Sequence, residues 1–271
     1  MLGQTRLREL VTQQIQDGTF PHFCILNGAV GSGKKTFIDE VIIPSIGGIK
    51  YPVEVSIEGI REMIKQAYTI NTPIVYVIQD ADKLSVPAKN ALLKVTEEPP
   101  NDTYIIMTLE NMDNTLSTIR SRSTVYSMDI YSGTELREYY EKVCPDGKDL
   151  QVILDLCENP GEIDALINIG VAQFYDYVEQ CVDNVAETTI SNVFKLGDKL
   201  SLKQGAEGYD LKLFFKAFIS VCLTRAHTGD TLKYTAGISI TSKFLQQISI
   251  NGVSKQMLLD DWILEMRQAW E

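Results

Sequence analysis

Residues 28–36, which read GAVGSGKKT, decide the fold that the sequence predicts. They match the phosphate-binding P-loop pattern as far as Lys34, but the pattern has serine or threonine at the next position, where Lys35 stands. An apolar run, FCILNG at 23–28, leads into the loop, and a segment of helical character follows it. A strand, a glycine-rich loop and a helix in this order give a P-loop match its weight. The alternative is a Gly/Ser turn with two solvated lysines, which the flanking elements disfavour.

Strand and helix signals alternate around this loop over the first 130 residues. The apolar runs are continuous and rich in β-branched residues, as expected of strands buried on both faces. The strands are predicted at 23–28, 51–55, 73–80, 103–109 and 123–128, and the helices at 6–17, at 34–43 ending at Pro44, at 57–67 with Ser56 as N-cap, and at 86–97. This order predicts an α/β fold with a mostly parallel five-stranded sheet, covered by helices on both faces.

Beyond residue 130 the strand signals fade and the chain is predicted to be all-α. Short helices are predicted within 133–144 and 148–170, and three or four longer amphipathic helices within 171–271. The boundaries fall near residues 130 and 171. The sequence therefore predicts a P-loop core over 1–130 followed by two helical parts, 131–170 and 171–271.

Composition limits the classes of function. With 36 acidic and 25 basic residues the net charge is −11, so the chain alone should bind nucleic-acid backbones poorly, because that affinity comes largely from Lys and Arg. Five cysteines without a C-x-x-C pair, and only two histidines, predict no zinc site. We see no signal peptide and no apolar run of the roughly 20 residues that span a bilayer. We therefore expect a cytoplasmic protein with reduced thiols and no membrane contact.

The sequence departs from the pattern of an active P-loop ATPase in two places, the loop and the end of a strand. The ammonium of Lys35 has no lone pair to offer Mg²⁺, unlike the hydroxyl usually found there. At the end of the strand 73–80 the expected aspartate and glutamate are replaced by Gln79 and Asp80. In the loop, Thr36 could supply a hydroxyl only through a register slip. At the strand end, an alternative register assigns Asp80 to the metal and leaves Asp82 two positions away. Both departures predict impaired hydrolysis.

Several stretches together resemble one family. PHFCILNG at 21–28, VYVIQDADKLSVPAKNALLKVTEEPP at 75–100 and TIRSR at 118–122 are similar to the AAA+ clamp-loader family, in particular to its delta-prime-like members in bacterial DNA polymerase III. The resemblance is strong over 1–130, weaker to about residue 170, and rests on helical character alone beyond that. It implies an AAA+ core over 1–130, a helical lid over 131–170 and a collar-like oligomerisation domain over 171–271.

The resemblance also implies an assembly. Such proteins form part of a five-subunit ring that opens a sliding clamp and loads it at primer-template junctions, with ATP held between neighbouring subunits. Each ATP site is completed by an arginine from the next subunit, in a Ser-Arg-Cys motif that here reads Ser121-Arg122-Ser123. The expected partners are gamma/tau-like ATPase and delta-like subunits, with the clamp and DNA reached through the assembly.

Three further departures accompany the resemblance. Serine replaces the cysteine of the arginine motif. In the lid turn NPGEIDAL at 159–166, Glu162 or Ile163 stands where ATP-hydrolysing members have an arginine. A glutamate there would repel a triphosphate, and no screening partner is evident in the sequence. The zinc module of many delta-prime relatives is missing from 43–56, which contains no cysteine.

Lys35, Gln79 and the missing lid arginine all affect the chain's own nucleotide site. Arg122, which by the resemblance would complete a neighbour's site, is retained. The leading hypothesis is a stator-like subunit with weak ATP binding or none; the alternatives are a working AAA+ ATPase motor that uses Thr36 and Asp80, and a P-loop small-molecule kinase. The kinase should have an arginine-rich lid, but only Arg137 lies between residue 130 and Arg225. The candidate site residues are Arg122 as arginine finger, Asp80 as degenerate Walker B acid, and, for nucleotide binding, Gly28, Gly31, Ser32, Gly33, Lys34, Lys35, Thr36, Gln79 and Thr108. No metal ligands are predicted.

Overall fold

The computed structural model describes residues 2–69, 72–100, 102–144, 149–185, 199–201, 209–227, 229–248 and 253–270. The chain divides into two compact units, Met1–Glu135 with Asn159–Gly161, and Leu136–Glu158 with Glu162–Glu271. Most of the predicted lid and all of the predicted collar fall in the second unit, and the boundary between them stays a prediction. The prediction of helices over 171–271 also covers 186–198, which lie outside the described residues.

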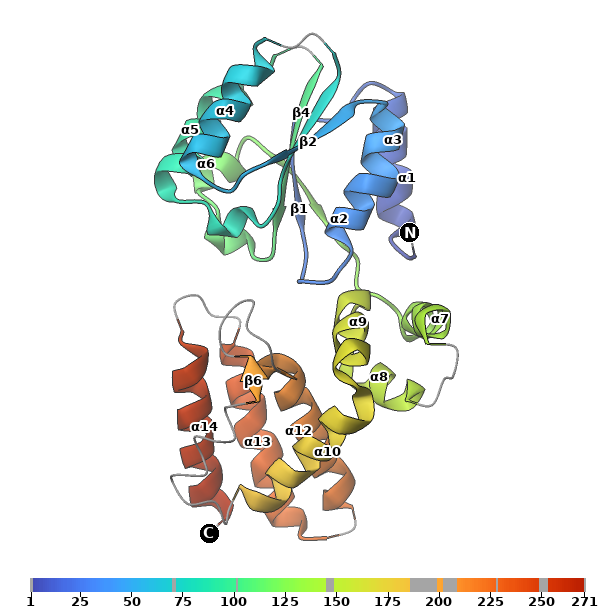
Figure 1. Ribbon diagram of the computed structural model, residues 1–271, viewed down its shortest axis with the longest axis vertical. Coiled ribbons are helices and arrows are strands. Elements are labelled where there is room, and N and C mark those ends of the chain that lie inside the picture. The colour runs from blue at the N-terminus through green and yellow to red at the C-terminus, as the bar shows by residue number, and fades with distance from the viewer. Residues whose placement is uncertain are drawn as a thin grey trace. The chain divides into compact units, whose positions relative to one another are not determined.

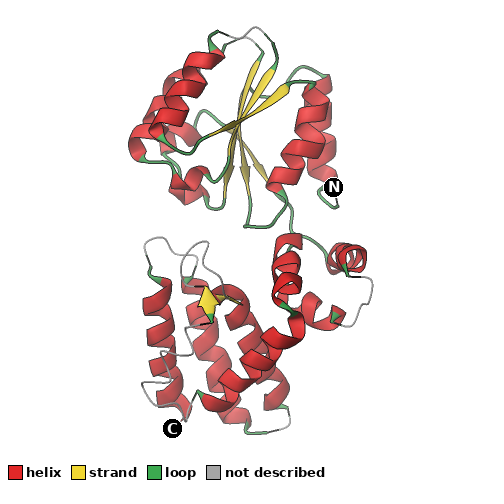
Figure 2. Ribbon diagram, viewed as in Figure 1, coloured by secondary structure: helices red, strands yellow, loops and turns green. Residues whose placement is uncertain are grey.

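The first unit contains the predicted parallel sheet of five strands (Figures 1 and 2), in the order β2-β3-β4-β1-β5. All neighbouring pairs run parallel. The strands are β1 (Phe23–Asn27), β2 (Ile49–Val53), β3 (Ile74–Ile78), β4 (Thr103–Leu109) and β5 (Thr124–Ser127). Because every strand runs the same way, all the carboxyl ends meet at one edge of the sheet and all the amino ends at the other.

Helices cover both faces of this sheet, as predicted (Figure 1). One face carries α1 (Thr5–Gln16), α2 (Lys34–Phe37), the π-helix η1 (Ile38–Ile42) and α3 (Ile43–Ile46), and the other carries α4 (Ile57–Ala67), α5 (Val86–Glu97) and α6 (Ser117–Arg120). Strand residues alternate between two buried clusters, one on each face, so that Ile25 joins the α4–α5 side and Leu26 the α1–α2 side. Two short 3-10 helices, η2 (Ala81–Lys83) and η3 (Met112–Asn114), follow β3 and β4.

Two of the differences from the predicted boundaries involve a proline. The helix after the loop does not end at Pro44, because the π-helix Ile38–Ile42 precedes a further turn, Ile43–Ile46, with Pro44 in its first positions. The helical segment thus continues through Pro44, which lacks an N–H for a helix hydrogen bond, and it ends at Gly47, whose φ is 69°. Strand β2 begins two residues before the predicted start, and it lies at the sheet edge, where an exposed Pro52 is acceptable.

Two predicted helix starts are confirmed by their caps. Ser56 Oγ accepts the Gly59 N–H at 2.9 Å, and Ser85 Oγ accepts the Ala88 N–H at 3.4 Å. Each side chain satisfies a backbone donor that the first turn of a helix leaves unpaired. Helix α5, which Ser85 begins, has the bounds that the sequence predicts.

The second unit is helical in its described part, apart from the short parallel pair β6 (Leu200–Ser201) and β7 (Tyr209–Asp210). Its helices are α7 (Gly133–Val143), which begins in the first unit, α8 (Leu150–Leu156), α9 (Pro160–Ile169), α10 (Val171–Asn184), α12 (Leu211–Ala226), α13 (Thr231–Gln247) and α14 (Lys255–Trp270). Trp262 is fully buried against Phe214, Phe215 and Phe218 of α12. Within the described residues, no helix has the length and apolar character needed to cross a membrane.

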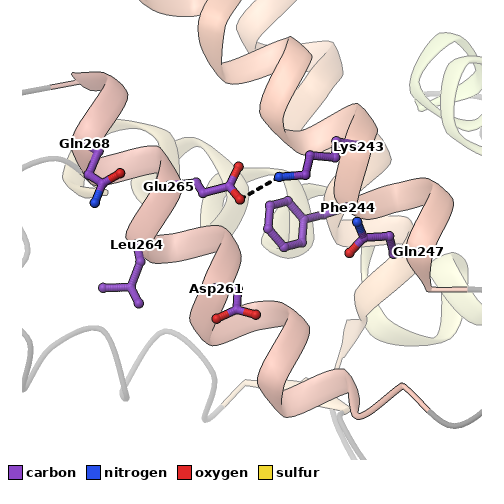
Figure 3. A pocket seen from close by; sticks show the side chains of 7 residues that line it. All are labelled: Lys243, Phe244, Gln247, Asp261, Leu264, Glu265 and Gln268. Atoms are coloured by element: carbon purple, nitrogen blue, oxygen red, sulfur yellow. Dashed lines mark hydrogen bonds and ion pairs between the residues drawn. The ribbon is translucent and has the colours of Figure 1, made fainter.

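A shallow groove of about 310 Å³ lies between α13 and α14 (Figure 3). Lys243 of α13 and Glu265 of α14 form an ion pair across it at 2.6 Å, and Phe244 lies beside them. The groove is lined by Lys243, Phe244, Gln247, Asp261, Leu264, Glu265 and Gln268. Its lining is mostly polar and it is open to solvent, so it adds little to the core.

Thr241→Val should destabilise the second unit by about 1–3 kcal/mol, because the buried Trp262 N–H loses its acceptor. Thr241 is fully buried and its Oγ1 accepts the Trp262 Nε1–H at 3.0 Å. Both tryptophans of the chain, Trp262 and Trp270, lie in α14, so urea unfolding followed by tryptophan fluorescence reports on this unit. Thr235→Val on the exposed face of α13 is the control. Equal unfolding midpoints for the two variants would contradict the assigned role of Thr241.

Candidate nucleotide site and arginine motif

The glycine-rich loop joins β1 to α2 at the carboxyl edge of the sheet. Gly31 and Gly33 have φ values of 81° and 87°, a region that favours glycine. The Gly28 N–H donates to the Leu109 carbonyl at 3.1 Å, which ties the loop to the end of β4. Lys34 Nζ turns back and donates to the carbonyls of Gly28 and Ala29 at 2.6 and 2.8 Å. The Lys34 ammonium is therefore hydrogen-bonded to carbonyls of the same loop.

Burial and the nearby carboxylates have opposite effects on the pKa of Lys34. Burial lowers the pKa of its ammonium, whereas the carboxylates of Glu110, Asp80 and Asp82 act to raise it. Sequence reasoning missed Glu110, although its position directly after the buried strand β4 could have indicated it, because parallel strands end at the same edge. The two following positions of the loop motif, Lys35 and Thr36, are exposed in the first turn of α2.

The loop has features that suit a phosphate, but it is also covered. Ser32 is 6% exposed, and its Oγ has no hydrogen-bond partner in the described part of the chain. Its carbonyl accepts the Tyr131 hydroxyl at 3.0 Å. The turn Asn159–Gly161, which groups with the first unit, lies directly on the loop, where the Gly161 N–H donates to the Gly31 carbonyl at 3.1 Å. A Cβ at Gly31 would lie 2.8 Å from Gly161 Cα, so this approach requires glycine.

The acids after β3 are engaged within the chain. Asp80 has φ 50°, is exposed and pairs with Lys83 at 2.8 Å. The Asp80 N–H donates to Thr108 Oγ1 at 3.0 Å, so two of the predicted nucleotide-site residues lie together. Gln79, which lies in the chain between the end of β3 and Asp80, is half-buried.

Asp82 has a structural role. Its carboxylate accepts the N–H groups of Glu110 at 2.8 Å and Asn111 at 3.3 Å, and the Asn114 side-chain amide at 3.2 Å. From the other side, the buried Lys89 of α5 donates to the Asn114 carbonyl at 2.5 Å. These bonds hold the segment after β4, and they engage the carboxylate of Asp82, which the alternative register leaves two positions from Asp80.

The residues at the expected metal position do not fit Mg²⁺. Lys35 brings a cation where the pattern has a hydroxyl, and Asp80 is neutralised by Lys83. Among the residues that the structure describes, no group of three His, Cys, Asp or Glu side chains is placed to hold a metal ion. We derive no chemical step through magnesium.

Arg122 lies at the opposite edge of the sheet. It follows α6 and precedes β5, whose first residue Thr124 pairs with Cys24 near the start of β1. The guanidinium contacts Glu97 at the end of α5, with Nε and Nη2 at 2.9 and 2.7 Å from Glu97 Oε1, and Nη1 donates to the Thr118 carbonyl at 3.0 Å. Arg120, the neighbour that could be confused with it, is exposed.

Glu162 has partners that the sequence did not indicate. Its carboxylate lies 3.1 Å from Lys212 Nζ and 3.2 Å from Lys216 Nζ, both on α12, and Glu158 joins the same group. Burial tends to lower the pKa of Lys212, but Glu162 and Glu158 raise it above its ordinary value of 10.5. The ion pairs therefore stabilise the fold below that pH and weaken as pH rises past it. The expected unscreened glutamate is instead paired within the second unit.

The fold and loop define the class of protein. The order β2-β3-β4-β1-β5, with a glycine-rich loop after β1 and helices following the sheet, is that of an AAA+ P-loop protein. Solved structures of Thermotoga maritima RuvB share the fold: one mutant form has a TM-score of 0.52 at 14% identity, covering 96% of this chain and 89% of that chain. The RuvB Holliday junction branch migration motor of the same organism has a TM-score of 0.51 at 14% identity, covering 96% and 82%.

Sequence comparisons narrow the class. Residues 49–131 match the family described as DNA polymerase III, delta subunit. DNA polymerase III subunit delta' of Haemophilus influenzae is 35% identical over 74 residues (27% of this chain and 23% of that one), and its Pseudomonas aeruginosa counterpart is 25% identical over 203 residues (72% and 58%). The gamma subunit of Buchnera aphidicola is 24% identical over 177 residues (54% and 49%). The matches thus span less than two thirds of each relative's length, and they show that this chain is similar to delta' and gamma subunits of DNA polymerase III.

Lys216→Met should destabilise the second unit by about 2–3 kcal/mol, because it leaves the largely buried Glu162 with only one of its two lysines. The side chains of Lys216 and Glu162 are 10% and 13% exposed. Lys142→Met is the matched control, since Lys142 is 63% exposed and forms a helical i,i+4 pair with Glu138, which contributes about 0.5 kcal/mol or less. Urea unfolding followed by tryptophan fluorescence measures both. A Lys216→Met midpoint equal to that of the control would show that the pairs contribute nothing.

Proposed function

We propose that this chain is a delta-prime-like clamp-loader subunit that acts as a stator. It lends Arg122 to the ATP site of a neighbouring ATPase subunit and hydrolyses little or no ATP itself. The observation that carries the proposal is the position of Arg122 at the amino edge of the sheet. That edge and the loop lie at opposite ends of β1. From Cys24, which pairs with Thr124 after Arg122, to Asn27 before the loop, the strand spans roughly 10 Å, at about 3.3 Å per residue. The distance of Arg122 from the loop therefore supports a role at a site other than the chain's own.

The chain's own site supports the other half of the proposal. The loop amides and Lys34 would hold the phosphates of a bound nucleotide, and ATP supplies the phosphoanhydride that such proteins cleave. Binding there must first displace the bonds that Lys34 makes to the Gly28 and Ala29 carbonyls. Of the acids near it, Asp80 pairs with Lys83 and Asp82 accepts backbone N–H groups, so neither of these two is free to orient an attacking water.

The partners follow from the same reading. We infer assembly with a gamma-type ATPase subunit, to which Arg122 would be presented, and contact with the clamp and DNA through that assembly. With a net charge of −11 the isolated chain is poorly suited to duplex DNA. The similarity to a gamma subunit supports a second candidate function, that of an ATPase motor that uses Asp80.

Arg122→Ala should lower the ATPase rate of the assembled complex while leaving assembly intact. An arginine supplied to a neighbouring site contributes about 10³–10⁵ in rate in other P-loop proteins. Without it, the one site that Arg122 completes should contribute almost nothing to the total ATPase rate of the complex. Steady-state hydrolysis by the complex reconstituted with its gamma-type subunit measures this, and gel filtration checks assembly. Arg120→Ala is the control. A normal rate for Arg122→Ala would contradict the proposal.

The isolated chain should bind ATP weakly and without help from Mg²⁺. Titration with a fluorescent ATP analogue, with and without Mg²⁺, measures this. Lys35→Thr restores the hydroxyl of the motif, and we expect it to make binding depend on Mg²⁺. Tight, magnesium-dependent binding by the unchanged chain, followed by hydrolysis that Asp80→Asn abolishes, would favour the motor instead.

A further inference from the structure

The contact between Arg122 and Glu97 joins two elements of the fold. Glu97 is the last residue of α5, and Arg122 follows α6, so 25 residues separate them in the chain. Glu97 Oε1 accepts from both Nε and Nη2 of the guanidinium, at 2.9 and 2.7 Å. The Thr118 carbonyl accepts from Nη1 at 3.0 Å. Contacts at three nitrogens fix both the position and the plane of the guanidinium.

Stability alone does not explain this carboxylate. The side chains of Glu97 and Arg122 are 52% and 37% exposed, and exposed ion pairs add little to the stability of a fold. The end of a helix also disfavours a negative charge, because the helix dipole is negative there. Glu97 occupies this unfavourable position and contacts the one arginine that the arginine motif carries.

The elements that carry the two residues are firmly held. Ile119 of α6 is fully buried in the same core cluster as Leu92 and Val95 of α5. The Arg122 N–H donates to the Ile119 carbonyl at 3.1 Å, which fixes the turn that bears the arginine. The ion pair therefore joins side chains whose backbones do not move apart without opening the core.

We propose that Glu97 is a positioning residue for Arg122, an inference that rests on the proposed function. A guanidinium carries five N–H groups. Three are used by Glu97 and Thr118, which leaves one on each terminal nitrogen, as far as the described residues go, for a phosphate of the neighbouring subunit. Glu97 holds the side chain in this orientation before the neighbour arrives, so that less freedom is lost when the site closes.

The ion pair can be tested in the isolated chain by NMR of arginine side chains. In the unchanged protein the Arg122 Nε–H, assigned by its absence in Arg122→Lys, should exchange slowly with water. Glu97→Gln should make it exchange faster. Glu98→Gln is the matched control, since the adjacent Glu98 is equally a helix-end carboxylate but contacts neither Arg122 nor Thr118 in the described structure. Unchanged exchange in Glu97→Gln would overturn the geometric basis of the proposal.

The consequence is tested in the complex reconstituted with its gamma-type subunit. Glu97→Gln should slow the one site that Arg122 serves by several-fold to about 10²-fold, the cost of a small misplacement of a catalytic group. The total kcat should therefore fall by no more than it does in Arg122→Ala, with KM for ATP unchanged. Glu97→Asp, which keeps the charge, should retain part of the rate, and Glu98→Gln should match the unchanged complex. A normal or raised kcat for Glu97→Gln would overturn the positioning role.

The two failures are distinguishable. If Arg122→Ala lowers the rate but Glu97→Gln does not, only the role of Glu97 is wrong. If Arg122→Ala leaves the rate unchanged, the proposed function itself is wrong, whatever the NMR experiment shows.

Discussion

The parallel pairing of β1 with β4 and β5 is the constraint on which the functional features depend. It aligns Asn27 with Leu109 and with Ser127, so that the loop leaves the sheet between the ends of β4 and β5. The same register brings the start of β5 to the start of β1. A chain that must place one group at its own nucleotide and another at a neighbour's can use the two edges of one sheet, because the strand length keeps them apart.

At the carboxyl edge the polar groups bind one another. Lys34 bonds to loop carbonyls, Asp80 to Lys83, and Asp82 to backbone N–H groups after β4. Each such bond is worth only about 0.5–1.5 kcal/mol net, but a nucleotide and its metal would have to replace several together. An active site works in the opposite way, with groups already directed at the position where charge develops. At this edge Lys34, Asp80 and Asp82 are therefore engaged with groups of the chain itself.

The central strands and most helices of the first unit could be predicted because their signals are local. Strands β1, β3 and β4 are continuous buried runs, and α5 carries its own N-cap in Ser85. The edge strand β2 is largely exposed and includes Pro52, so no continuous apolar run marks its bounds. The helix through Pro44 was mispredicted because a π-turn has no clear sequence signature.

The side-chain partners at the site were harder to predict than the elements. The P-loop, Gln79–Asp80 and Arg122 could be found from motifs, because each lies at a fixed spacing from a strand or helix. Glu162 and its lysines on α12, however, are about 50 residues apart in the chain, and no local pattern joins them. Glu97 lies inside the stretch that indicates the family, yet only the packing of α5 against α6 shows which cation it meets.

Under the proposed function Arg122 is shared between subunits, and an exposed Glu–Arg pair suits that role. In water the two charges attract each other weakly, because the high dielectric constant screens them, so the arginine can take up a second anion at little cost. The carboxylate meanwhile screens the positive charge from unrelated anions in an otherwise acidic chain. When a neighbouring subunit closes over the pair and excludes water, the same charges interact more strongly. A contact that contributes little to the isolated fold can then contribute most where the neighbour's phosphate is bound.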